Sequence, residues 1–319
     1  MDLSVVVPVY GCAGCLEALH YQVSRAVRAL DLTYELVLVD DCGPDDSWLV
    51  IAALVRADPD HVRAVRLSRN YGQHAAITAG LAECRGRAAV VMDCDLQDPP
   101  EDIGKLYARY REGHQVILTR RVNKKHHPLK RLSSRCFGWL MSTFTDQQVM
   151  SEVGSFSLIG RPVIDAFLLF KDVNRHYLYI LGWLGFDPVY VDYEHRERVS
   201  GRSSYSLRKL IRLAMQGVFF QTTDFLQAIV GLGLLLFVFG MTVSIWAFYI
   251  AILGHPIAGW ASTLIATSLL GGFVIFIQGV IGLYVGQIFD QVKDRPIYVV
   301  ADRLGGDIGK TLGDGILAS

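Results

Sequence analysis

Short apolar runs rich in β-branched residues alternate with amphipathic stretches through the first two-thirds of the chain. The apolar runs predict strands over residues 4–10, 34–40, 62–67, 88–92 and 115–119. The stretches between them predict helices over residues 16–30, 47–55 and 73–84. This alternation is typical of an α/β fold with a mostly parallel sheet, and strands that are apolar along their whole length predict a sheet covered on both faces.

Polar residues gather directly after three of the predicted strands. These strands run into the sequences PVYG, VDDCGPDDS and MDCDLQDPP. Ligands of parallel α/β sheets bind just beyond the carboxyl ends of the strands, so these three places form the candidate site. The chain has no G-x-G-x-x-G after its first strand and no G-x-x-x-x-G-K-[ST], so neither a dinucleotide cofactor nor a phosphate loop is expected.

The sequence DCDLQD predicts a metal site. Asp93 and Asp95 lie two residues apart at a strand end and therefore point to the same side, where their charges repel each other. Together with Gln97 they form a set of hard oxygen donors that suits Mg²⁺ or Mn²⁺, and such a cation could bridge to a diphosphate. Asp98 precedes two prolines and an acidic residue, and we assign it mainly to capping a helix.

The charge distribution predicts a membrane part. Lys+Arg and Asp+Glu both total 31, so no bulk attraction to nucleic acid is expected. No charged residue lies between Asp224 and Asp290, and the apolar runs 226–253 and 260–289 each exceed the roughly 20 residues that cross a bilayer. Soluble helices are the alternative, but they rarely stay uncharged on every face.

The basic residues predict the orientation of these runs. They flank both runs and are absent from the loop 254–259, which predicts that both ends of the chain are cytoplasmic.

Residues 207–219 show helical spacing of apolar positions, with Arg208 and Arg212 on the other side. This pattern predicts a helix that lies in the membrane interface, with its arginines near lipid phosphates. The alternative is that this helix packs on the soluble domain, and the helix can do both at once. The glycine-rich apolar runs permit tight packing between subunits, so a homo-oligomer is compatible with the sequence.

The motifs VVVPVY, VDDCGPDDS, SRNYGQHAAITAGL and DCDLQDPPE, with a tail that ends in LYVGQIFDQVKDRP, resemble the polyprenyl-phosphate glycosyltransferases of glycosyltransferase family 2. A single D-x-D motif is weak evidence for a family, whereas this set of motifs, in this order and spacing over nearly the whole chain, is specific. The resemblance implies a cytoplasmic GT-A nucleotide-sugar domain over residues 1–202, a juxtamembrane helix over 203–224, two transmembrane helices over 225–289 and a cytoplasmic tail over 290–319. It implies a multi-pass protein of the inner, cytoplasmic membrane.

The resemblance also implies the reaction. A sugar would pass with inversion from a nucleotide-diphosphate donor, expected to be UDP-linked, to a polyprenyl phosphate such as undecaprenyl phosphate. The product would be a lipid-linked monosaccharide for modification of cell-envelope glycans. Because the acceptor phosphate is already anionic, the protein must mainly align the reactants and stabilise charge on the leaving diphosphate.

The family's site positions carry over to matching residues of this sequence. The base and ribose positions fall on Pro8, Tyr10, Val39 and Asp41. The metal and diphosphate positions fall on Asp93, Cys94, Asp95 and Gln97. The positions near the diphosphate or the lipid phosphate fall on Arg120 or Arg121, Arg131, Arg198 and Ser203. We expect Asp93, Asp95 and the arginines to carry catalysis, although an isolated arginine is more often only a solvated surface residue.

Four positions depart from the family pattern and leave other functions open. Ser204 replaces a lysine, Ser157 an arginine and Cys12 a glutamate, while Glu152 is the candidate replacement for an aspartate. These changes keep open a catalytically inactive, membrane-anchored scaffold that binds nucleotide sugars. A processive polysaccharide synthase is the other alternative, but the chain lacks Q-x-x-R-W and has only two predicted spans for a polymer channel.

Overall fold

The computed structural model describes residues 1–121, 153–172, 175–193 and 259–305, together with Thr242, Ile245 and Tyr249. The chain divides into two compact units. The first, here called the sheet unit, comprises Met1–Arg131, Val149–Ser204 and Pro296–Ser319. The second unit comprises Leu132–Gln148 and Tyr205–Arg295.

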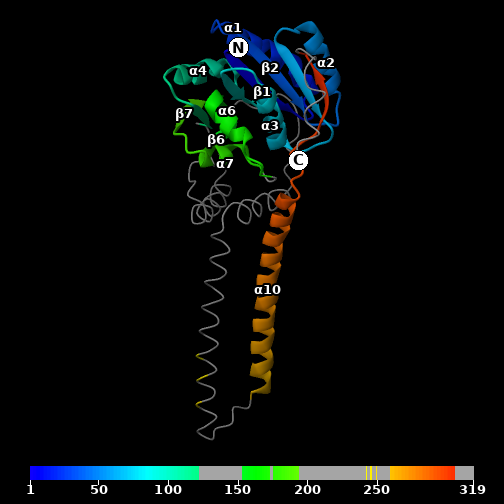
Figure 1. Cartoon of the computed structure of the whole chain (residues 1–319), viewed down its shortest axis with the longest axis vertical. Coiled ribbons are helices and arrows are strands. Elements are labelled where there is room, and N and C mark those ends of the chain that lie inside the picture. Colours follow the sequence, from blue (N-terminus) through cyan, green and yellow to red (C-terminus); the bar gives the residue numbers. More distant parts are fainter. Residues whose placement is uncertain are drawn as a thin grey trace, which may run out of the picture. The chain divides into compact units, whose positions relative to one another are not determined.

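A mixed sheet forms the centre of the sheet unit (Figure 1). Its strands are β1 (Leu3–Val9), β2 (Tyr34–Asp40), β3 (Val62–Leu67), β4 (Ala88–Val91), β5 (Val116–Arg121), β6 (Val153–Gly160), β7 (Pro188–Tyr193) and β8 (Val300–Leu304). In space they follow the order β7-β5-β6-β4-β1-β2-β3-β8. Strands β4, β1, β2 and β3 are parallel, as are β5 and β7, whereas β6 and β8 run antiparallel to their neighbours. The predicted α/β fold with a mostly parallel sheet is therefore confirmed.

Helices cover both faces of this sheet. They are α1 (Leu16–Arg28), α2 (Ser47–Ala57), α3 (Gln73–Glu83), α4 (Ile103–Arg111), α6 (Arg161–Leu168) and α7 (Tyr177–Trp183), with short 3₁₀ turns η1 (Ala13–Cys15) and η2 (Pro100–Asp102). Because side chains alternate along a strand, Val5 packs in one hydrophobic cluster and Val6 in the other. Helix α3 lies close to β1 at Gly80, where an added Cβ would clash with Val6 Cγ1.

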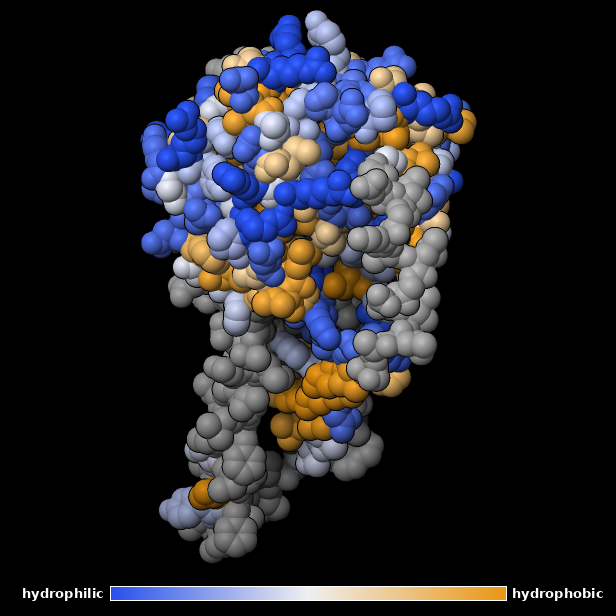
Figure 2. All heavy atoms as spheres, turned by 45° about the horizontal axis from the view of Figure 1, so that its top comes forward, coloured by the Kyte–Doolittle hydropathy of each residue, from blue (hydrophilic) through white to orange (hydrophobic). Residues whose placement is uncertain are grey.

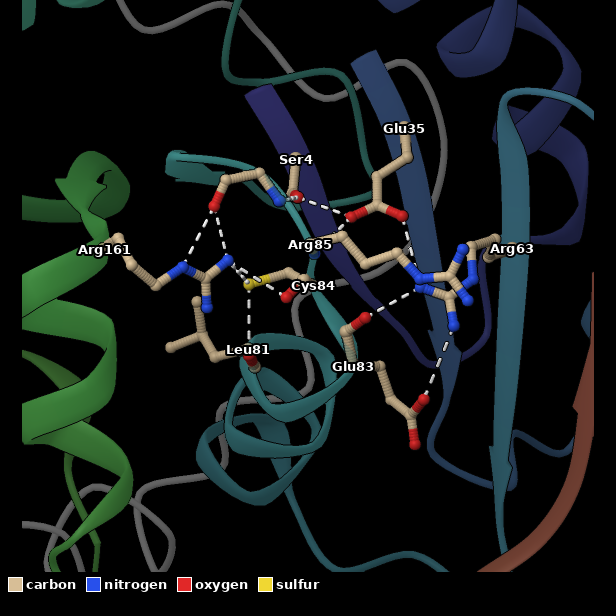
Figure 3. A network of polar contacts seen from close by, with 9 residues as sticks. Ser4, Glu35, Arg63, Leu81, Glu83, Cys84, Arg85 and Arg161 are labelled. Carbon is tan, nitrogen blue, oxygen red and sulfur yellow. Dashed lines mark hydrogen bonds and ion pairs between the residues drawn. The ribbon is translucent and has the colours of Figure 1, made fainter. Parts of the chain in front are cut away.

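Buried ionic groups hold the amino ends of the strands together (Figure 3). Glu35 of β2 is 1 % exposed and accepts hydrogen bonds from Ser4 Oγ at 2.6 Å and Arg63 Nη1 at 3.2 Å. The backbone N–H of Arg85 donates to the same carboxylate at 2.5 Å. Arg161 of α6 donates to the carbonyls of Cys84 and Gly86, so the chain on both sides of Arg85 is held. This network stabilises the amino ends of the strands, which lie opposite the carboxyl ends that form the candidate site.

The predicted strands and helices agree with the structure to within one or two residues at most ends. The strands β6, β7 and β8 were not predicted. Strand β8 has the sequence VADRL, which lacks an apolar run, and it lies in the segment that we expected to be a separate tail. It pairs antiparallel with β3 at the edge of the sheet. Residues 300–304 therefore complete the sheet unit after the chain has passed through the second unit.

The main described element of the second unit is the helix α10 (Trp260–Val292), 33 residues long. Its bounds agree with the second predicted apolar run. No helix among the described residues combines the length and apolar character needed to span a membrane. Nearly all of the first apolar run and the whole amphipathic segment 207–219 lie outside the described residues. The two spans therefore stay predictions.

Candidate functional site

The candidate site is built from loops at the carboxyl ends of β1, β2 and β4. The first two loops are joined, because Asp45 Oδ2 accepts a hydrogen bond from Ala13 N at 2.9 Å and Ser47 Oγ accepts one from Cys12 N at 3.3 Å. The backbones also approach closely, since a Cβ on Gly43 would lie 3.0 Å from the nitrogen of Gly11. Tyr10 stands at this junction with a side chain that is 53 % exposed. Hydrophilic side chains predominate on the face of the sheet unit drawn in Figure 2.

Two of the predicted base-binding residues lie in the core. Val39 is fully buried and packs in the hydrophobic cluster that contains α3. Pro8 is also buried, within β1. Their side chains therefore support the sheet beneath the loops, and Tyr10 is the exposed member of the predicted group.

Asp41 holds the start of helix α3. Its side chain, at the end of β2, is 3 % exposed and accepts hydrogen bonds from Tyr71 N at 2.7 Å and Gly72 N at 2.8 Å. Gly72 has φ +95°, which an L side chain rarely adopts. Burial raises the pKa of Asp41, while the two backbone N–H groups oppose this by favouring the anion. Asp41 thus fixes the loop from β3 to α3, a role that its position after a strand did not indicate.

The acidic loop after β4 presents alternate residues to solvent. Asp93, Asp95 and Gln97 are partly exposed, whereas Cys94, Leu96 and Asp98 between them are buried. The loop is held by Asp95 Oδ1, which accepts a hydrogen bond from Gln97 N at 3.2 Å. A hydrogen bond with the Cys12 thiol, together with burial, raises the pKa of Cys94, so this thiol stays protonated.

The cap role expected of Asp98 is wrong. The residue that caps η2 is Pro99, and no side chain caps this turn. Asp98 is 2 % exposed and instead accepts hydrogen bonds from Asp93 N at 3.3 Å and from Tyr193 Oη at 3.0 Å. Its carboxylate therefore ties the acidic loop to the end of β7, because the fold brings Asp93 N and Tyr193 Oη within hydrogen-bonding distance.

Two side chains that the sequence did not single out contact Asp93. Gln73, the first residue of α3, donates from Nε2 to Asp93 Oδ1 at 2.8 Å. Ser155 of β6 donates from Oγ to the same oxygen at 3.1 Å. Gln73 belongs to the motif SRNYGQHAAITAGL, so a signal was present, but only the fold shows which residue it faces.

The residues Asp93, Asp95 and Gln97 fit a divalent cation by their chemistry. Mg²⁺ is usually bound by one or two carboxylates together with waters and substrate phosphates, and this loop supplies two carboxylates and an amide oxygen. Within the described ranges, no group of three or more His, Cys, Asp or Glu side chains is arranged to hold a metal ion. The protein donors would thus form only part of a coordination shell, which substrate oxygens and water would complete.

The predicted arginines are only partly placed. Arg120 of β5 makes a two-point ion pair with Asp192 of β7, with Nε–Oδ1 2.8 Å and Nη2–Oδ2 3.2 Å. Both side chains are about half exposed, so water screens the pair. Hydrogen bonding from Arg120 lowers the pKa of Asp192. Arg131, Arg198 and Ser203 lie outside the described residues, as do Glu152 and Ser204.

Ser157, which replaces the family's arginine, is fully buried. Its hydroxyl lies 2.9 Å from the hydroxyl of Tyr177 and donates to the carbonyl of Ser155 at 2.9 Å. Burial of the Tyr177 phenol raises its pKa above the usual range. Ser157 therefore fills a neutral buried position beneath the site, where an unpaired charge would be costly.

A pair of imidazoles packs beside Gln73. The rings of His74 and His176 have centroids 4.2 Å apart, and His74 Nδ1 accepts a hydrogen bond from Tyr177 N at 3.3 Å. Burial lowers the pKa of His74 to about 4 and that of His176 to about 3, where His74 adds to the effect. Both rings are therefore neutral at pH 7. Nδ1 of His176 is buried without a hydrogen-bond partner in the described part of the chain.

Comparisons with known proteins identify the family. Glycosyl transferase family 2 matches residues 4–168. Uncharacterized glycosyltransferase YkcC of Bacillus subtilis is 33% identical over 307 residues, which cover 96% of this chain and 95% of that protein. The SfII prophage-derived bactoprenol glucosyl transferase of Shigella flexneri is 30% identical, with 94% and 97% covered. The undecaprenyl-phosphate 4-deoxy-4-formamido-L-arabinose transferase of Proteus mirabilis is 29% identical, with 95% and 94% covered.

The matched region begins in β1, contains the three strand-end loops and ends with α6, so it includes every described part of the candidate site except β7 and α7. The relatives in turn match along almost the whole chain, beyond the sheet unit. This protein is therefore a glycosyltransferase of family 2, with a GT-A-like α/β domain.

Proposed function

We propose that this protein transfers a sugar from a UDP-linked donor to undecaprenyl phosphate or a similar polyprenyl phosphate, with inversion at the anomeric carbon. The observation that carries the proposal is the acidic loop, in which Asp93, Asp95 and Gln97 are exposed together at the carboxyl ends of parallel strands. The acceptor class rests on the relatives, whose names specify bactoprenol and undecaprenyl phosphate and which match this chain nearly end to end. The product would serve modification of cell-envelope glycans.

The donor nucleotide would lie along the joined loops after β1 and β2. The exposed ring of Tyr10 supplies an aromatic surface on which a base can stack. Asp41 would act chiefly by holding Tyr71 and Gly72 in place, although a carboxylate has about four acceptor sites and can also accept a base N–H. The donor would thereby extend from Tyr10 towards the acidic loop.

The diphosphate would lie at the acidic loop. Asp93, Asp95 and Gln97 would hold Mg²⁺ or Mn²⁺ there. When bound, such a cation acts as a Lewis acid that stabilises charge on the leaving diphosphate. Arg198 and Arg131 are proposed to neutralise further phosphate charge, and Arg120 would do so only after exchanging its partner Asp192.

The acceptor phosphate needs little activation, because it is already anionic at neutral pH. Neither His74 nor His176 is required as a general base, and their low pKa values suit neutral structural roles. The protein's main contribution would be to align the lipid phosphate with the anomeric carbon and to exclude water, which would otherwise hydrolyse the donor.

A lipid acceptor requires the sheet unit to work at a membrane surface. We propose two transmembrane helices, with both ends of the chain cytoplasmic and residues 207–219 in the interface. Exposed apolar side chains along α10 support a lipid-facing helix; they include Leu270, Val274, Ile281, Val285 and Ile288. The positively charged flanks of the two apolar runs support the orientation.

The test is sugar transfer by the purified full-length chain in lipid nanodiscs, with a panel of UDP-sugars, with and without undecaprenyl phosphate. Attachment of one sugar per lipid supports the proposal. Formation of a polymer would instead identify a processive synthase, and donor binding without turnover would identify an inactive scaffold. Asp95→Ala is the matched negative control, because loss of a partly exposed carboxylate leaves the fold intact.

A further inference from the structure

The structure assigns Gln73 and Ser155 as positioning residues that hold the Asp93 carboxylate in the orientation needed for metal and diphosphate binding. This inference rests on the proposed function and adds two residues to it. Both side chains donate to one oxygen, Asp93 Oδ1, at 2.8 Å and 3.1 Å. A carboxylate that accepts two hydrogen bonds through one oxygen has a defined plane, so the direction of its second oxygen is set.

The two donors come from different parts of the fold. Gln73 lies on α3, which packs on one face of the sheet, and Ser155 lies on β6, which is inserted beside β4. Asp93 follows β4 directly, and its backbone N–H is bound to the buried Asp98. The side chain of Asp93 is thus held from α3 and β6 and its backbone by Asp98 of its own loop, an arrangement that opposes rotation of the carboxylate.

Gln73 is placed by Asp41. The carboxylate of Asp41 binds the backbone N–H of Tyr71 and Gly72, which directly precede Gln73 and fix where α3 begins. The left-handed φ of Gly72 turns the chain into the helix at this point. The end of β2, beside the proposed base site, is therefore linked to the acidic loop through three consecutive residues.

Ser155 is placed by the buried layer beneath it. Its carbonyl accepts a hydrogen bond from Ser157 Oγ, and Ser157 lies 2.9 Å from the Tyr177 hydroxyl. Tyr177 is 1 % exposed and packs in the hydrophobic core. Because Ser157 and Tyr177 have little freedom to move, the Ser155 hydroxyl is presented to Asp93 from a rigid strand.

The expected effect follows from the behaviour of groups that hydrogen-bond to metal ligands. Removing such a group typically weakens metal affinity by about 10–100-fold, because the ligand must then be ordered at the time of binding. We expect Gln73→Leu and Ser155→Ala each to weaken Mn²⁺ affinity several-fold, and the double variant to weaken it by roughly 10–100-fold. Ser155→Thr keeps a hydroxyl and should restore most of the affinity.

The experiment measures Mn²⁺ binding to the full-length chain in nanodiscs in the presence of UDP, from the electron paramagnetic resonance signal of free Mn²⁺. Gln115→Leu is the matched control, because Gln115 donates to the Gly113 carbonyl before β5, far from the acidic loop. Thermal unfolding of each variant shows whether the fold is kept. The KM for Mn²⁺ in sugar transfer should rise in parallel with the dissociation constant.

The outcomes separate this inference from the proposed function. Wild-type protein that binds no Mn²⁺ with UDP would contradict the proposed metal site itself. Wild-type binding with an unchanged double variant would overturn the positioning role alone. The role would also be overturned if Ser155→Thr failed to restore affinity, or if Gln115→Leu weakened binding as much as Gln73→Leu.

Discussion

The buried Glu35 network provides a sharp test of what holds the sheet together. Glu35→Ala removes three hydrogen bonds, from Ser4 Oγ, Arg63 Nη1 and Arg85 N. It also leaves the Arg63 guanidinium, only 16% exposed, with the more distant Glu83 Oε2 at 3.6 Å as its remaining carboxylate contact. Breaking a buried ion pair by removing one partner costs about 3–5 kcal/mol, because the remaining charge is not solvated. Glu35→Gln keeps the shape and one acceptor, so we expect a smaller loss of about 1.5–3 kcal/mol.

The assay is thermal unfolding of the full-length chain, followed by near-ultraviolet circular dichroism. For a domain of this size, 1 kcal/mol corresponds to roughly 2–4 °C in Tm, so Glu35→Ala should lower Tm by about 6–20 °C. Glu112→Gln is the matched control, because Glu112 and its partner Arg109 are both half exposed and such pairs contribute about 0–1 kcal/mol. Donor affinity should not change, since the network lies at the opposite ends of the strands. A shift in Tm below about 2 °C for Glu35→Ala, or an equal shift for Glu112→Gln, would refute the reasoning.

Three further predictions concern pH, metal and topology. Folding lowers the pKa of His74 to about 4 and that of His176 to about 3. As pH falls below about 6.5, the unfolded chain therefore binds protons before the folded chain does. The free energy of unfolding should be fully retained above about pH 6.5 and should fall from there towards about pH 4. His176→Phe should flatten this dependence of Tm on pH, and an unchanged slope would argue against the assignment. Asp95→Ala should nearly abolish sugar transfer, and Gln97→Ala should reduce it less, because a neutral oxygen binds a hard cation more weakly. EDTA should stop transfer by the wild type, and Mg²⁺ or Mn²⁺ should restore it. Full activity in EDTA would exclude the metal site. A cysteine at His255 should be labelled from outside intact cells and a cysteine near the C-terminus should not; external labelling of the C-terminus would contradict the topology.

The site was predictable where its geometry is local. A pattern of period two in the sequence marked Asp93, Asp95 and Gln97, and the structure exposes all three in part on a loop that turns at Leu96, where φ is +60°. Polar clusters after apolar runs indicated which strand ends form the site, since the carboxyl ends of parallel strands meet at one edge. The same local reasoning failed for Asp98. Its position before two prolines favoured a helix cap, but its partners, Asp93 N and Tyr193 Oη, are set by the fold.

Residues that act through distant partners could not be found in this way. Ser155 contacts Asp93 across 62 positions, and the contact exists because antiparallel β6 lies between β4 and β5. Strand β8 carries too few apolar residues to be recognised, since an edge strand has one neighbour and its side chains stay largely exposed. Neither the order of strands nor the place of an edge strand follows from local periodicity.

The amino-acid sequence by itself determined the first five strands, the three helices between the first four of them, and the chemistry of the acidic loop. Backbone sterics and the burial of apolar side chains act over a few residues, so strands, helices and the acidic loop are encoded where they occur. The tertiary structure alone decided which polar groups meet: Asp41 with the start of α3, Gln73 and Ser155 with Asp93, and Arg120 with Asp192. These contacts depend on strand order and helix placement, which minimise exposed apolar surface over the whole unit, and hydrogen bonds become specific only after that packing has brought their atoms within about 3 Å.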